Sequence, residues 1–303
     1  MRIALEVWTS NFSLARDTCL RAESLGFDGF YYGESPTGLN LDCWTTLAAL
    51  ARDTTTIRLG PVISNILPQY RSLLLLAKQA ATVAIAADGR LDFRTGVGAA
   101  THHGRQWWRP YGIDYPNYEN RLNTLTHSLP ALRALWAGKS TVVAPSDDQP
   151  VELGFSCPPI PITVAATGTR AMSVARRHAH WWETSFHTPT SLAIDVARFE
   201  AFASASWPEP GPACSLEIDG FVGTTDQRAR AVITSARAER EAAGEDMDPV
   251  FSRGLVGPPA QVADQLQALA DAGAEQLVVA LHDPHDADAL TALAQARTLA
   301  ALD

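Results

Sequence analysis

Residues 91–98, Leu-Asp-Phe-Arg-Thr-Gly-Val-Gly, have the pattern of a buried β-strand that ends in two glycines. A stretch rich in leucine and alanine precedes them at residues 73–87 and has the apolar spacing of a helix. The same alternation extends in both directions along the chain. We expect strands at residues 2–8, 27–33, 57–63, 91–97, 160–166, 181–186, 215–222 and 277–281, with helical patterns between them.

About eight strand–helix units are the number that a closed parallel barrel requires. We therefore predict the α/β fold class, as a single (β/α)8 TIM-barrel domain over residues 1–303 with a small β-hairpin insertion near residues 140–156. The alternative is an open doubly wound sheet, which needs a glycine-rich phosphate turn after its first strand. Residues 9–13, Thr-Ser-Asn-Phe-Ser, follow the first strand here and contain no glycine.

The composition is that of an ordinary globular protein, with 46% hydrophobic and 19% charged residues. A net charge of −9 argues against a nucleic-acid partner, because the phosphates would be repelled. The four cysteines form no CxxC pair or zinc-ligand cluster, so we expect free thiols in the cytoplasm and no metal site. We expect no membrane partner, since no signal-peptide pattern is present and no apolar run approaches the ~20 residues of a membrane span.

The active site of such a barrel lies at the C-terminal ends of its strands. At the end of the fourth strand, Gly96 and Gly98 either let the backbone approach a flat ligand or form a tight turn with positive φ. Residues 99–118 follow them and are rich in histidine, tryptophan, tyrosine, glycine and proline. We expect a long functional loop there.

Two further strand ends carry candidate chemistry. Residues 165–170 join the fifth strand to a helix N-terminus, where free N–H groups suit a phosphate; an ordinary turn with a threonine cap is the alternative. His102 and His103 have no carboxylate at metal-ligand spacing, so we expect a proton donor or a cofactor contact, or else two surface histidines.

The ordered set of segments resembles one known family. Residues 81–82 and 88–98 resemble the "ATLD…SGGR…LGVG" block of the bacterial-luciferase-like superfamily, which contains luciferase-like monooxygenases and coenzyme F420-dependent oxidoreductases. Residues 26–34 resemble its second strand, residues 165–170 its phosphate turn, and residues 257–266 its closing helix. The resemblance spans nearly the whole chain.

The sequence also departs from this family. Many members carry an acidic residue followed by histidine at the end of the second strand, whereas here Glu34 is followed by Ser35. The sugar-phosphate dehydrogenases of the family place a glutamate shortly after the Gly-Val-Gly turn, where this chain has Thr101-His102-His103. We therefore expect a substrate different from those of both groups.

The resemblance implies a cofactor ring inside the strand C-terminal ends and a phosphate near Gly168 and Arg170. It also implies a non-prolyl cis peptide at Ile63–Ser64 or, as second choice, at Ser64–Asn65. The expected cofactor is coenzyme F420, with FMN as the alternative.

The predicted site consists of three groups of residues. The catalytic group is His102, as general acid, with Glu34 as its support or as a cofactor contact. The substrate-binding group is Trp8, Trp107 and His187, and Trp108 and Tyr111 are further candidates for an apolar wall. The cofactor-binding group is Ser64, Asn65, Gly96, Val97, Gly98, Ala166, Thr167, Gly168, Thr169 and Arg170.

Three functions remain open at this point. The compact chain favours an F420-dependent reductase or dehydrogenase that transfers hydride to or from a small organic substrate. A monooxygenase that uses reduced FMN and O2 is the alternative, and a barrel that binds flavin without turnover is the third. A small-molecule substrate is expected in the first two cases. A homodimer and a separate flavin or F420 reductase as electron supplier are expectations that the sequence leaves open.

Overall fold

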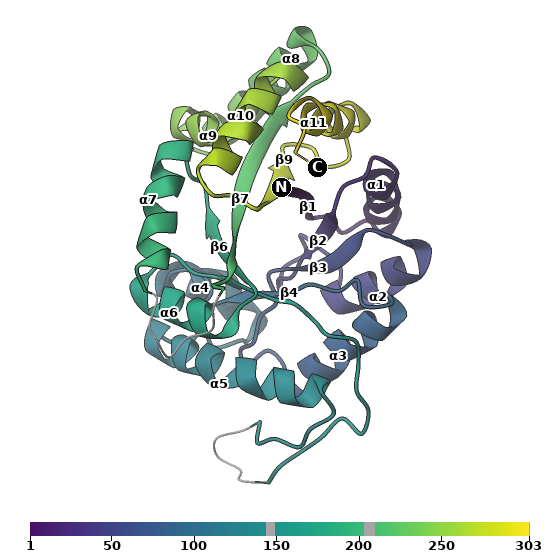
Figure 1. Ribbon diagram of the computed structural model, residues 1–303, viewed down its shortest axis with the longest axis vertical. Helices are drawn as coiled ribbons and strands as arrows, with labels where there is room; N and C mark the ends of the chain where they lie inside the picture. The colour runs from purple at the N-terminus through teal and green to yellow at the C-terminus, as the bar shows by residue number, and fades with distance from the viewer. Residues whose placement is uncertain (144–148, 203–209, 303) are drawn as a thin grey trace. The chain divides into compact units, whose positions relative to one another are not determined.

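The computed structural model describes residues 1–143, 149–202 and 210–302. Strands and helices alternate along the chain, as the colour gradient of Figure 1 shows. The strands are β1 (Arg2–Val7), β2 (Gly29–Gly33), β3 (Arg58–Val62), β4 (Phe93–Gly96), β5 (Ile162–Ala165), β6 (Trp181–Ser185), β7 (Ala213–Val222), β8 (Leu255–Gly257) and β9 (Gln276–Leu281).

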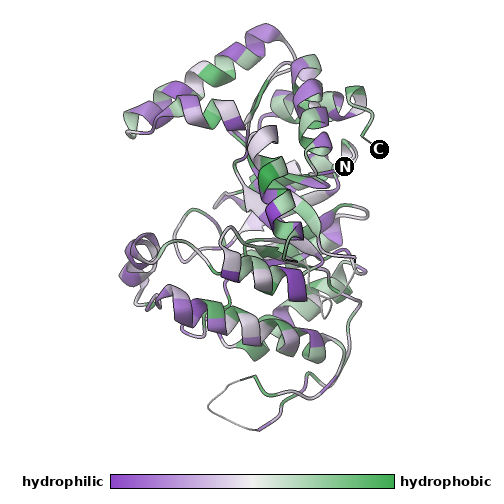
Figure 2. Ribbon diagram, turned by 60° about the vertical axis from the view of Figure 1, so that its left-hand side comes forward, coloured by the Kyte–Doolittle hydropathy of each residue, from purple (hydrophilic) through white to green (hydrophobic). Residues whose placement is uncertain are grey.

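Most helices carry hydrophilic and hydrophobic residues side by side, as helices that cover a sheet do (Figure 2). The helices are α1 (Phe12–Ser24), α2 (Cys43–Asp53), α3 (Leu73–Ala86), α4 (Thr101–Trp108), the 3-10 turn η1 (Arg109–Tyr111), α5 (Tyr118–Trp136), α6 (Thr169–His178), α7 (Pro189–Glu200), α8 (Asp226–Ala242), α9 (Met247–Arg253), α10 (Pro259–Asp271) and α11 (Ala287–Leu299).

The strands form one sheet in the order β3-β2-β1-β9-β7-β6-β5-β4, and the short strand β8 pairs with β7 outside this order. Parallel bridges Leu59–Leu91 and Ser64–Thr95 join the segments of β3 and β4 at the two ends of that order. The sheet is therefore a nearly closed parallel barrel alternating with helices, which confirms the predicted (β/α)8 fold.

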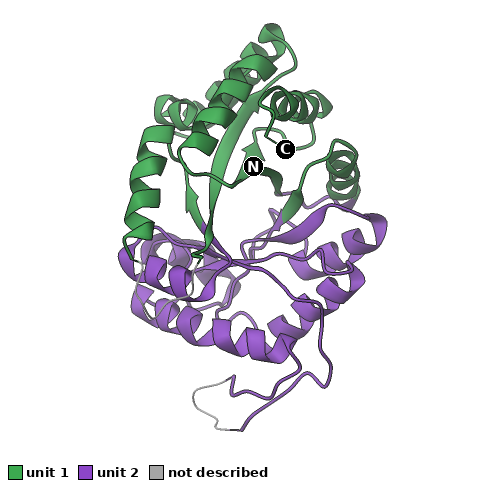
Figure 3. Cartoon of the chain, viewed as in Figure 1, with its two compact units in different colours: residues 1–7, 13–31, 183–303 green, residues 8–12, 32–182 purple. Residues whose placement is uncertain are grey.

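The contacts divide the chain into two compact units, coloured separately in Figure 3. One unit contains residues 1–7, 13–31 and 183–303, and the other contains residues 8–12 and 32–182. In the first, β9 pairs in parallel with both β1 and β7, from Arg2–Gln276 and Ser215–Gln276 onward. Leu277, Val278 and Val279 of β9 are fully buried, because a parallel strand covered on both faces is apolar throughout.

The second unit is built on β3, β4 and β5. Residues 93–96 of β4 pair in parallel with residues 162–165 of β5. Ser72 caps the N-terminus of α3, and the alanine-rich face of that helix is buried. The close approach that alanine permits lets the indole of Trp136, from α5, donate a hydrogen bond to the carbonyl of Ala77 over 3.0 Å. All of the predicted site residues except His187 belong to this unit.

The structure differs from the predictions in several local elements. Residues 99–118 are not a continuous loop, because α4 and η1 occupy residues 101–111. The strand β8 and the helix α9 were not predicted. β8 has only three residues and α9 only seven, and such short elements carry little periodic signal. Of the predicted hairpin near residues 140–156, the structure describes one antiparallel bridge, Thr141–Val151, and residues 144–148 lie outside the described residues.

The helix between β6 and β7 is α7 (Pro189–Glu200). A reciprocal capping box between Thr188 and Ser191 determines its start, and Pro189 occupies the first turn, where no backbone N–H donor is needed. Among the described residues, no helix is both long and apolar enough to cross a membrane.

The packing of α11 gives a stability prediction. Leu293 is fully buried, whereas Leu299 on the same helix is 61% exposed. We expect Leu293→Ala to lower the free energy of unfolding by about 2–5 kcal/mol, because it removes buried methyl groups and leaves a cavity. Leu299→Ala is the matched control and should change it by less than ~0.5 kcal/mol. Equal effects in urea denaturation would contradict the assigned burial of α11.

Candidate functional site

A small cavity lies at the C-terminal ends of β3 and β4. Its volume is about 50 Å3, and the segments 63–67 and 96–98 form most of its lining, together with Tyr115 and Arg121. Five of the predicted cofactor-binding residues line this one cavity: Ser64, Asn65, Gly96, Val97 and Gly98. The structure therefore brings together the parts of the site that the sequence placed at two separate strand ends.

A buried ion pair holds the β3 side of this cavity. Glu34, directly after β2, lies 2.6 Å from the guanidinium of Arg71, and their side chains are only 1% and 7% exposed. Glu34 also accepts a hydrogen bond from the backbone N–H of Asn65 over 2.7 Å. Arg71 donates to the hydroxyl of Ser64 and to the carbonyl of Asn65. The pair thus determines where residues 64–65 lie.

Aromatic rings and burial shape the electrostatics of this pair. The guanidinium of Arg71 lies over the rings of Tyr70 and Trp44, at 5.1 and 5.9 Å from their centroids. Burial raises the pKa of the Glu34 carboxyl, and the charge of Arg71 and the N–H of Asn65 oppose that rise. Burial, with the nearby charge of Glu34, also raises the pKa of Tyr70 to about 12, so that this phenol stays protonated.

The peptide bond between Val62 and Ile63 is cis, and neither residue precedes a proline. A non-prolyl cis peptide was expected at the end of the third strand, at Ile63–Ser64 or Ser64–Asn65. The segment was predicted correctly, but both choices of bond were wrong. Ser64 instead follows the cis bond by one residue and makes the bridge to Thr95, whose hydroxyl donates to the Ser64 carbonyl.

A second buried guanidinium holds the β4 side of the cavity. Arg121 of α5 is 3% exposed and donates to three backbone carbonyls, those of Val97, Ala99 and Pro116, and to the hydroxyl of Thr101. Its guanidinium also lies 4.3 Å from the ring centroid of Tyr115. Burial lowers the pKa of Arg121. These bonds position the turn after β4 and the start of α4.

Neighbouring protein atoms leave no room for a side chain at Gly96 and Gly98 in the turn after β4. Gly98 has φ +81°, and a Cβ at this position would lie 2.5 Å from the hydroxyl of Tyr115. A Cβ at Gly96 would lie 3.0 Å from the carbonyl oxygen of Ala165. The positive φ favours the tight-turn interpretation for Gly98, and at both positions the closest approach is to the protein itself.

The two candidate histidines lie on a helix, which changes the geometry assumed for them. His102 and His103 are exposed in the first turn of α4, and their rings lie 3.9 Å apart. His103 also stacks on Trp107, with centroids 5.9 Å apart. Successive helical residues diverge by about 100°, so the two imidazoles do not point in opposite directions as they would in an extended segment. Among the described contacts, none joins Glu34 to His102.

The tryptophans on and around this helix differ in burial. Trp108 is buried against Tyr70 and Tyr115, whereas Trp107 and Tyr111 are about half exposed. Trp8 is 37% exposed and covers Gly33, where a Cβ would lie 2.2 Å from its ring. Trp108 is therefore a core residue, and Trp8, Trp107 and Tyr111 are the accessible ones.

The predicted phosphate turn leads into α6. Gly168 is the N-cap residue of this helix, and no described side chain caps it. The residues from Thr167 to Arg170 are exposed, whereas Ala166 is buried and its carbonyl accepts a hydrogen bond from the indole of Trp182. An uncapped helix N-terminus leaves backbone N–H donors that an anion can accept from.

Arg170 is already engaged in an ion pair. It pairs with Glu119 of α5 through two hydrogen bonds of 2.5 and 2.7 Å, and both side chains are more than half exposed. This pairing lowers the pKa of Glu119 and raises that of Arg170. A phosphate at this turn would therefore meet the backbone N–H groups first and would have to compete with Glu119 for Arg170.

His187 lies in the other compact unit. Its ring nitrogens contact the hydroxyls of Thr184 and Ser191, and its Nε2 lies 3.3 Å from Asp195. Burial lowers the pKa of His187, and Asp195 opposes this effect. Of these partners, Ser191 also belongs to the capping box of α7, and the three contacts explain the position of His187 without a ligand.

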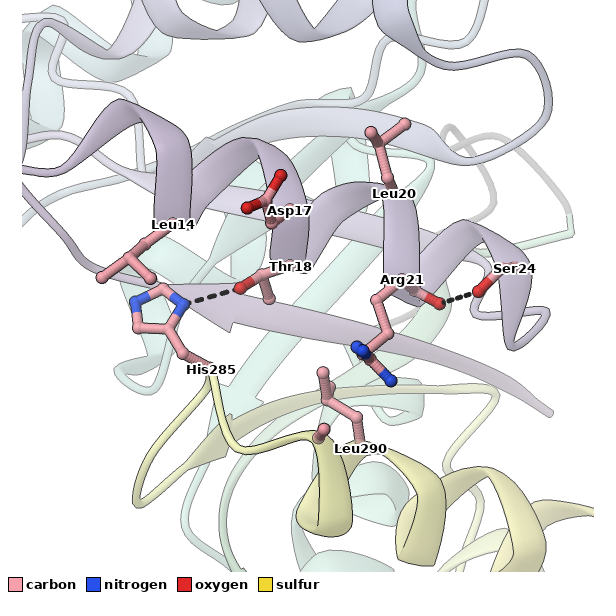
Figure 4. A pocket seen from close by; sticks show the side chains of 9 residues that line it. Leu14, Asp17, Thr18, Leu20, Arg21, Ser24, His285 and Leu290 are labelled. Carbon is pink, nitrogen blue, oxygen red and sulfur yellow. Dashed lines mark hydrogen bonds between the residues drawn. The ribbon is translucent and has the colours of Figure 1, made fainter.

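Larger concavities exist away from the predicted residues. One of about 560 Å3 lies between α1 and the start of α11, where Figure 4 shows His285 directed at Thr18 and Arg21 extending toward Leu290. The Thr18 hydroxyl and His285 Nδ1 are 2.6 Å apart. This concavity contains none of the predicted site residues. Among the described residues, no group of three or more His, Cys, Asp or Glu side chains is arranged to hold a metal ion.

Sequence reasoning missed three residues that shape the site: Arg71, Arg121 and Glu119. Arg71 is 37 positions from its partner Glu34, and Arg121 is 24 positions from the carbonyl of Val97. Arginine carries no periodic burial signal. Only the position of Arg121, four residues after the N-cap Asn117 in the first turn of α5, could have suggested a role at this end of the barrel.

The buried ion pair gives the second prediction. We expect Arg71→Met to lower the free energy of unfolding by about 3–5 kcal/mol, because the Glu34 carboxylate would remain buried without its cation. The double variant Glu34→Gln, Arg71→Met should recover a large part of that loss, since no charge is then left unpaired. Arg170→Gln is the control, an ion pair of similar length but high exposure, and should have a much smaller effect. Additive losses in the double variant would contradict the coupling.

Comparisons with known proteins agree with this fold and with the family resemblance. Residues 5–276 match the family model described as luciferase-like monooxygenase. The F420-dependent hydroxymycolic acid dehydrogenase of Mycobacterium tuberculosis is 26% identical over 272 residues, which are 84% of this chain and 72% of that protein.

Solved structures of two enzymes share the fold over nearly their whole length. An F420-dependent secondary alcohol dehydrogenase in complex with an F420-acetone adduct superposes with a TM-score of 0.81 at 15% identity, covering 99% of this chain and 98% of that one. The oxygenating constituent of 3,6-diketocamphane monooxygenase from Pseudomonas putida, in complex with FMN, superposes with a TM-score of 0.75 at 19% identity, covering 97% and 96%. The family model covers most of the chain, and the protein therefore belongs to the luciferase-like monooxygenase family.

Proposed function

We propose that this protein is a coenzyme F420-dependent oxidoreductase that transfers hydride to or from a small organic substrate. The observation that carries the proposal is its family membership together with the 26% identity to an F420-dependent dehydrogenase over 84% of the chain. A reduced-FMN-dependent monooxygenase is the second candidate, because a family neighbour of the same fold binds FMN.

The residues at the strand ends fit a flavin-type cofactor in two respects. The segments 64–65 and 96–98 form one cavity wall, held by buried arginines on both sides. The N-terminus of α6 is uncapped and exposed, and it can accept a phosphate. Ser64, Asn65 and Gly96–Gly98 would contact the ring, and the turn from Ala166 to Arg170 would hold the phosphate. The bound cofactor would supply the hydride chemistry, and the protein would supply binding and orientation.

Within this proposal, the chain residues have separate tasks. Glu34 and Arg71 fix the backbone of Asn65, which would contact the bound cofactor. Trp8 and Trp107 offer accessible apolar surface to the substrate. His102 supplies or accepts the proton that accompanies hydride transfer at a polar bond, since histidine titrates near neutral pH. The whole chain acts as one barrel domain, with a homodimer and a separate flavin or F420 reductase as further parts of the proposal.

Cofactor titration with a matched set of turn variants tests the proposal. We expect the purified protein to bind coenzyme F420 with a change in its absorbance or fluorescence, and to bind FMN more weakly. Gly168→Asp should weaken F420 binding about tenfold or more, because the new carboxylate would cap α6 and repel the phosphate. Gly168→Ala is the control and should bind nearly normally, since a Cβ there meets nothing closer than 3.8 Å.

The outcomes separate the candidates. Tight binding of FMN with no binding of F420 would replace the main proposal by the monooxygenase. Binding of either cofactor without turnover of any alcohol, ketone or aldehyde tested would favour the non-catalytic barrel. Equal affinity of the Asp and Ala variants would remove the α6 N-terminus from the phosphate site.

The proton donor is tested by two single substitutions on α4. We expect His102→Gln to reduce turnover by about 10²–10⁴ while cofactor affinity stays nearly unchanged. His103→Gln is the neighbouring control, since it removes an imidazole from the same helical turn. Loss of activity only in the His103 variant would reverse the assignment, and full activity in both would show that the proton comes from elsewhere.

A further inference from the structure

The segment between β2 and α2, residues 35–41, reverses the usual exposure of polar and apolar side chains. Its sequence is Ser-Pro-Thr-Gly-Leu-Asn-Leu. Asn40 is only 8% exposed, whereas Leu39 and Leu41 on either side of it are 66% and 37% exposed. In folded proteins an asparagine is mostly exposed and a leucine is mostly buried. The two leucines therefore lie in water for a reason that the segment itself has to supply.

Hydrogen bonds within the segment hold its polar side chains inward. The Ser35 hydroxyl donates to Oδ1 of Asn40 over 2.9 Å and lies 2.7 Å from the Thr37 hydroxyl. The Asn40 amide donates to the carbonyl of Leu41 over 2.7 Å, and the Thr37 hydroxyl accepts the N–H of Leu39 over 3.3 Å. These bonds order the backbone that carries both leucines. A ligand that covers an ordered surface loses less conformational entropy on binding.

Tyr32 joins this segment to the one that follows β1. Its buried hydroxyl donates to the carbonyl of Thr9 and accepts the N–H of Leu41, the latter over 3.0 Å. Burial raises the pKa of Tyr32, so the phenol keeps the proton that it donates. Trp8, directly before Thr9, is partly exposed and its ring covers Gly33, the last residue of β2. The tryptophan and the leucines therefore belong to adjoining segments at the same strand ends.

The surface formed by Trp8, Leu39 and Leu41 adjoins the candidate site and has no charged neighbours in its own segments. Glu34, whose carboxylate accepts from the N–H of Asn65 in the cavity wall, directly precedes residues 35–41. Residues 8–12 and 35–41 contain no Asp, Glu, Lys or Arg. A charged group on this surface would lose hydration without gaining an ion pair, whereas an alkyl group would gain free energy by leaving water.

The extent of this surface suits a small molecule better than a protein. A stable protein–protein interface buries about 800 Å2 on each partner, which takes twenty or more residues. Three partly exposed side chains fall far short of that area. They match instead the apolar walls that line small-molecule sites, where a few polar groups orient the ligand.

We propose that Trp8, Leu39 and Leu41 determine substrate specificity, and that they bind the alkyl arm of an uncharged secondary alcohol or its ketone. The arm is several carbons long, and the reacting carbon lies at the cavity of residues 64–65 and 96–98. Oxidation of such an alcohol passes its C–H hydrogen to the cofactor as hydride and its O–H proton to a base, and leaves the ketone. This role in turnover rests on the proposed function, whereas the affinity of the surface for an alkyl chain does not.

A series of secondary alcohols, from propan-2-ol to octan-2-ol, tests the proposal in steady-state kinetics with F420. We expect kcat/KM to rise roughly two- to fourfold for each added methylene group that the surface covers. The rise should come from a falling KM at nearly constant kcat, because the alkyl arm makes the same contacts in the ground state and in the transition state. A carboxylate at the far end of the arm should abolish the gain.

Two double variants separate this surface from other exposed leucine and isoleucine side chains. Leu39→Ser, Leu41→Ser should remove most of the dependence of KM on chain length and leave the KM for propan-2-ol nearly unchanged. Ile85→Ser, Leu299→Ser is the matched control and should keep the dependence. Both control residues are exposed in the last turns of α3 and α11, away from the C-terminal ends of the strands.

Three results would overturn the proposal: a KM that does not depend on chain length, an undiminished dependence in the Leu39, Leu41 variant, or a change of that variant from dimer to monomer in sedimentation. The last result would assign the leucines to an interface between copies of the chain. If no alcohol is turned over, the proposed function fails, and calorimetric titration of the protein without cofactor decides the remaining question. Preferential binding of octan-2-ol over propan-2-ol that only the Leu39, Leu41 variant loses would support the surface. Equal binding of the two alcohols would overturn it.

Discussion

The candidate site depends on one constraint, the buried ion pair between Glu34 and Arg71. A carboxylate that is 1% exposed would be strongly disfavoured without a cation, and the guanidinium at 2.6 Å supplies it. Because Arg71 also binds the Ser64 hydroxyl and the Asn65 carbonyl, while Glu34 accepts from the Asn65 N–H, the pair leaves the segment after β3 little freedom. A ligand that meets Ser64 and Asn65 meets backbone already ordered, which reduces the entropy lost on binding.

Arg121 orders the segment after β4, as the ion pair orders the segment after β3, but it does so through hydrogen bonds to backbone carbonyls. It pairs with no described carboxylate and instead satisfies the carbonyls of Val97, Ala99 and Pro116. Carbonyl dipoles do not neutralise a full charge, so this side of the cavity keeps a net positive character. The two sides therefore differ: the β3 side is electrically balanced, and the β4 side favours an electron-rich or anionic group.

The sequence predicted what depends on periodicity and missed what depends on distant partners. The apolar run of β9 and the alanine-rich face of α3 are periodic patterns that predicted elements of the barrel. Residues 96–98, Ser64 and Asn65 were correctly expected at neighbouring strand ends. The helix over residues 101–108 was missed, because histidine, glycine and tryptophan are weak helix formers and its start has no capping side chain. Arg71 and Arg121 were missed because no periodic pattern marks a buried arginine, and partners such as Glu34 and Val97 lie 37 and 24 positions away in the sequence.

The turn before α6 and the arginines at residues 105 and 109 offer different kinds of hydrogen-bond donor. Arg170 is bound to Glu119, so the α6 turn offers mainly backbone N–H groups, which suit a compact phosphate at a helix N-terminus. Arg105 of α4 and Arg109 of η1 are exposed, and no described ion pair joins either of them to a carboxylate. Both kinds of donor lie along residues 97–121 and 168–170, and the buried bonds of Arg121 hold that stretch in place.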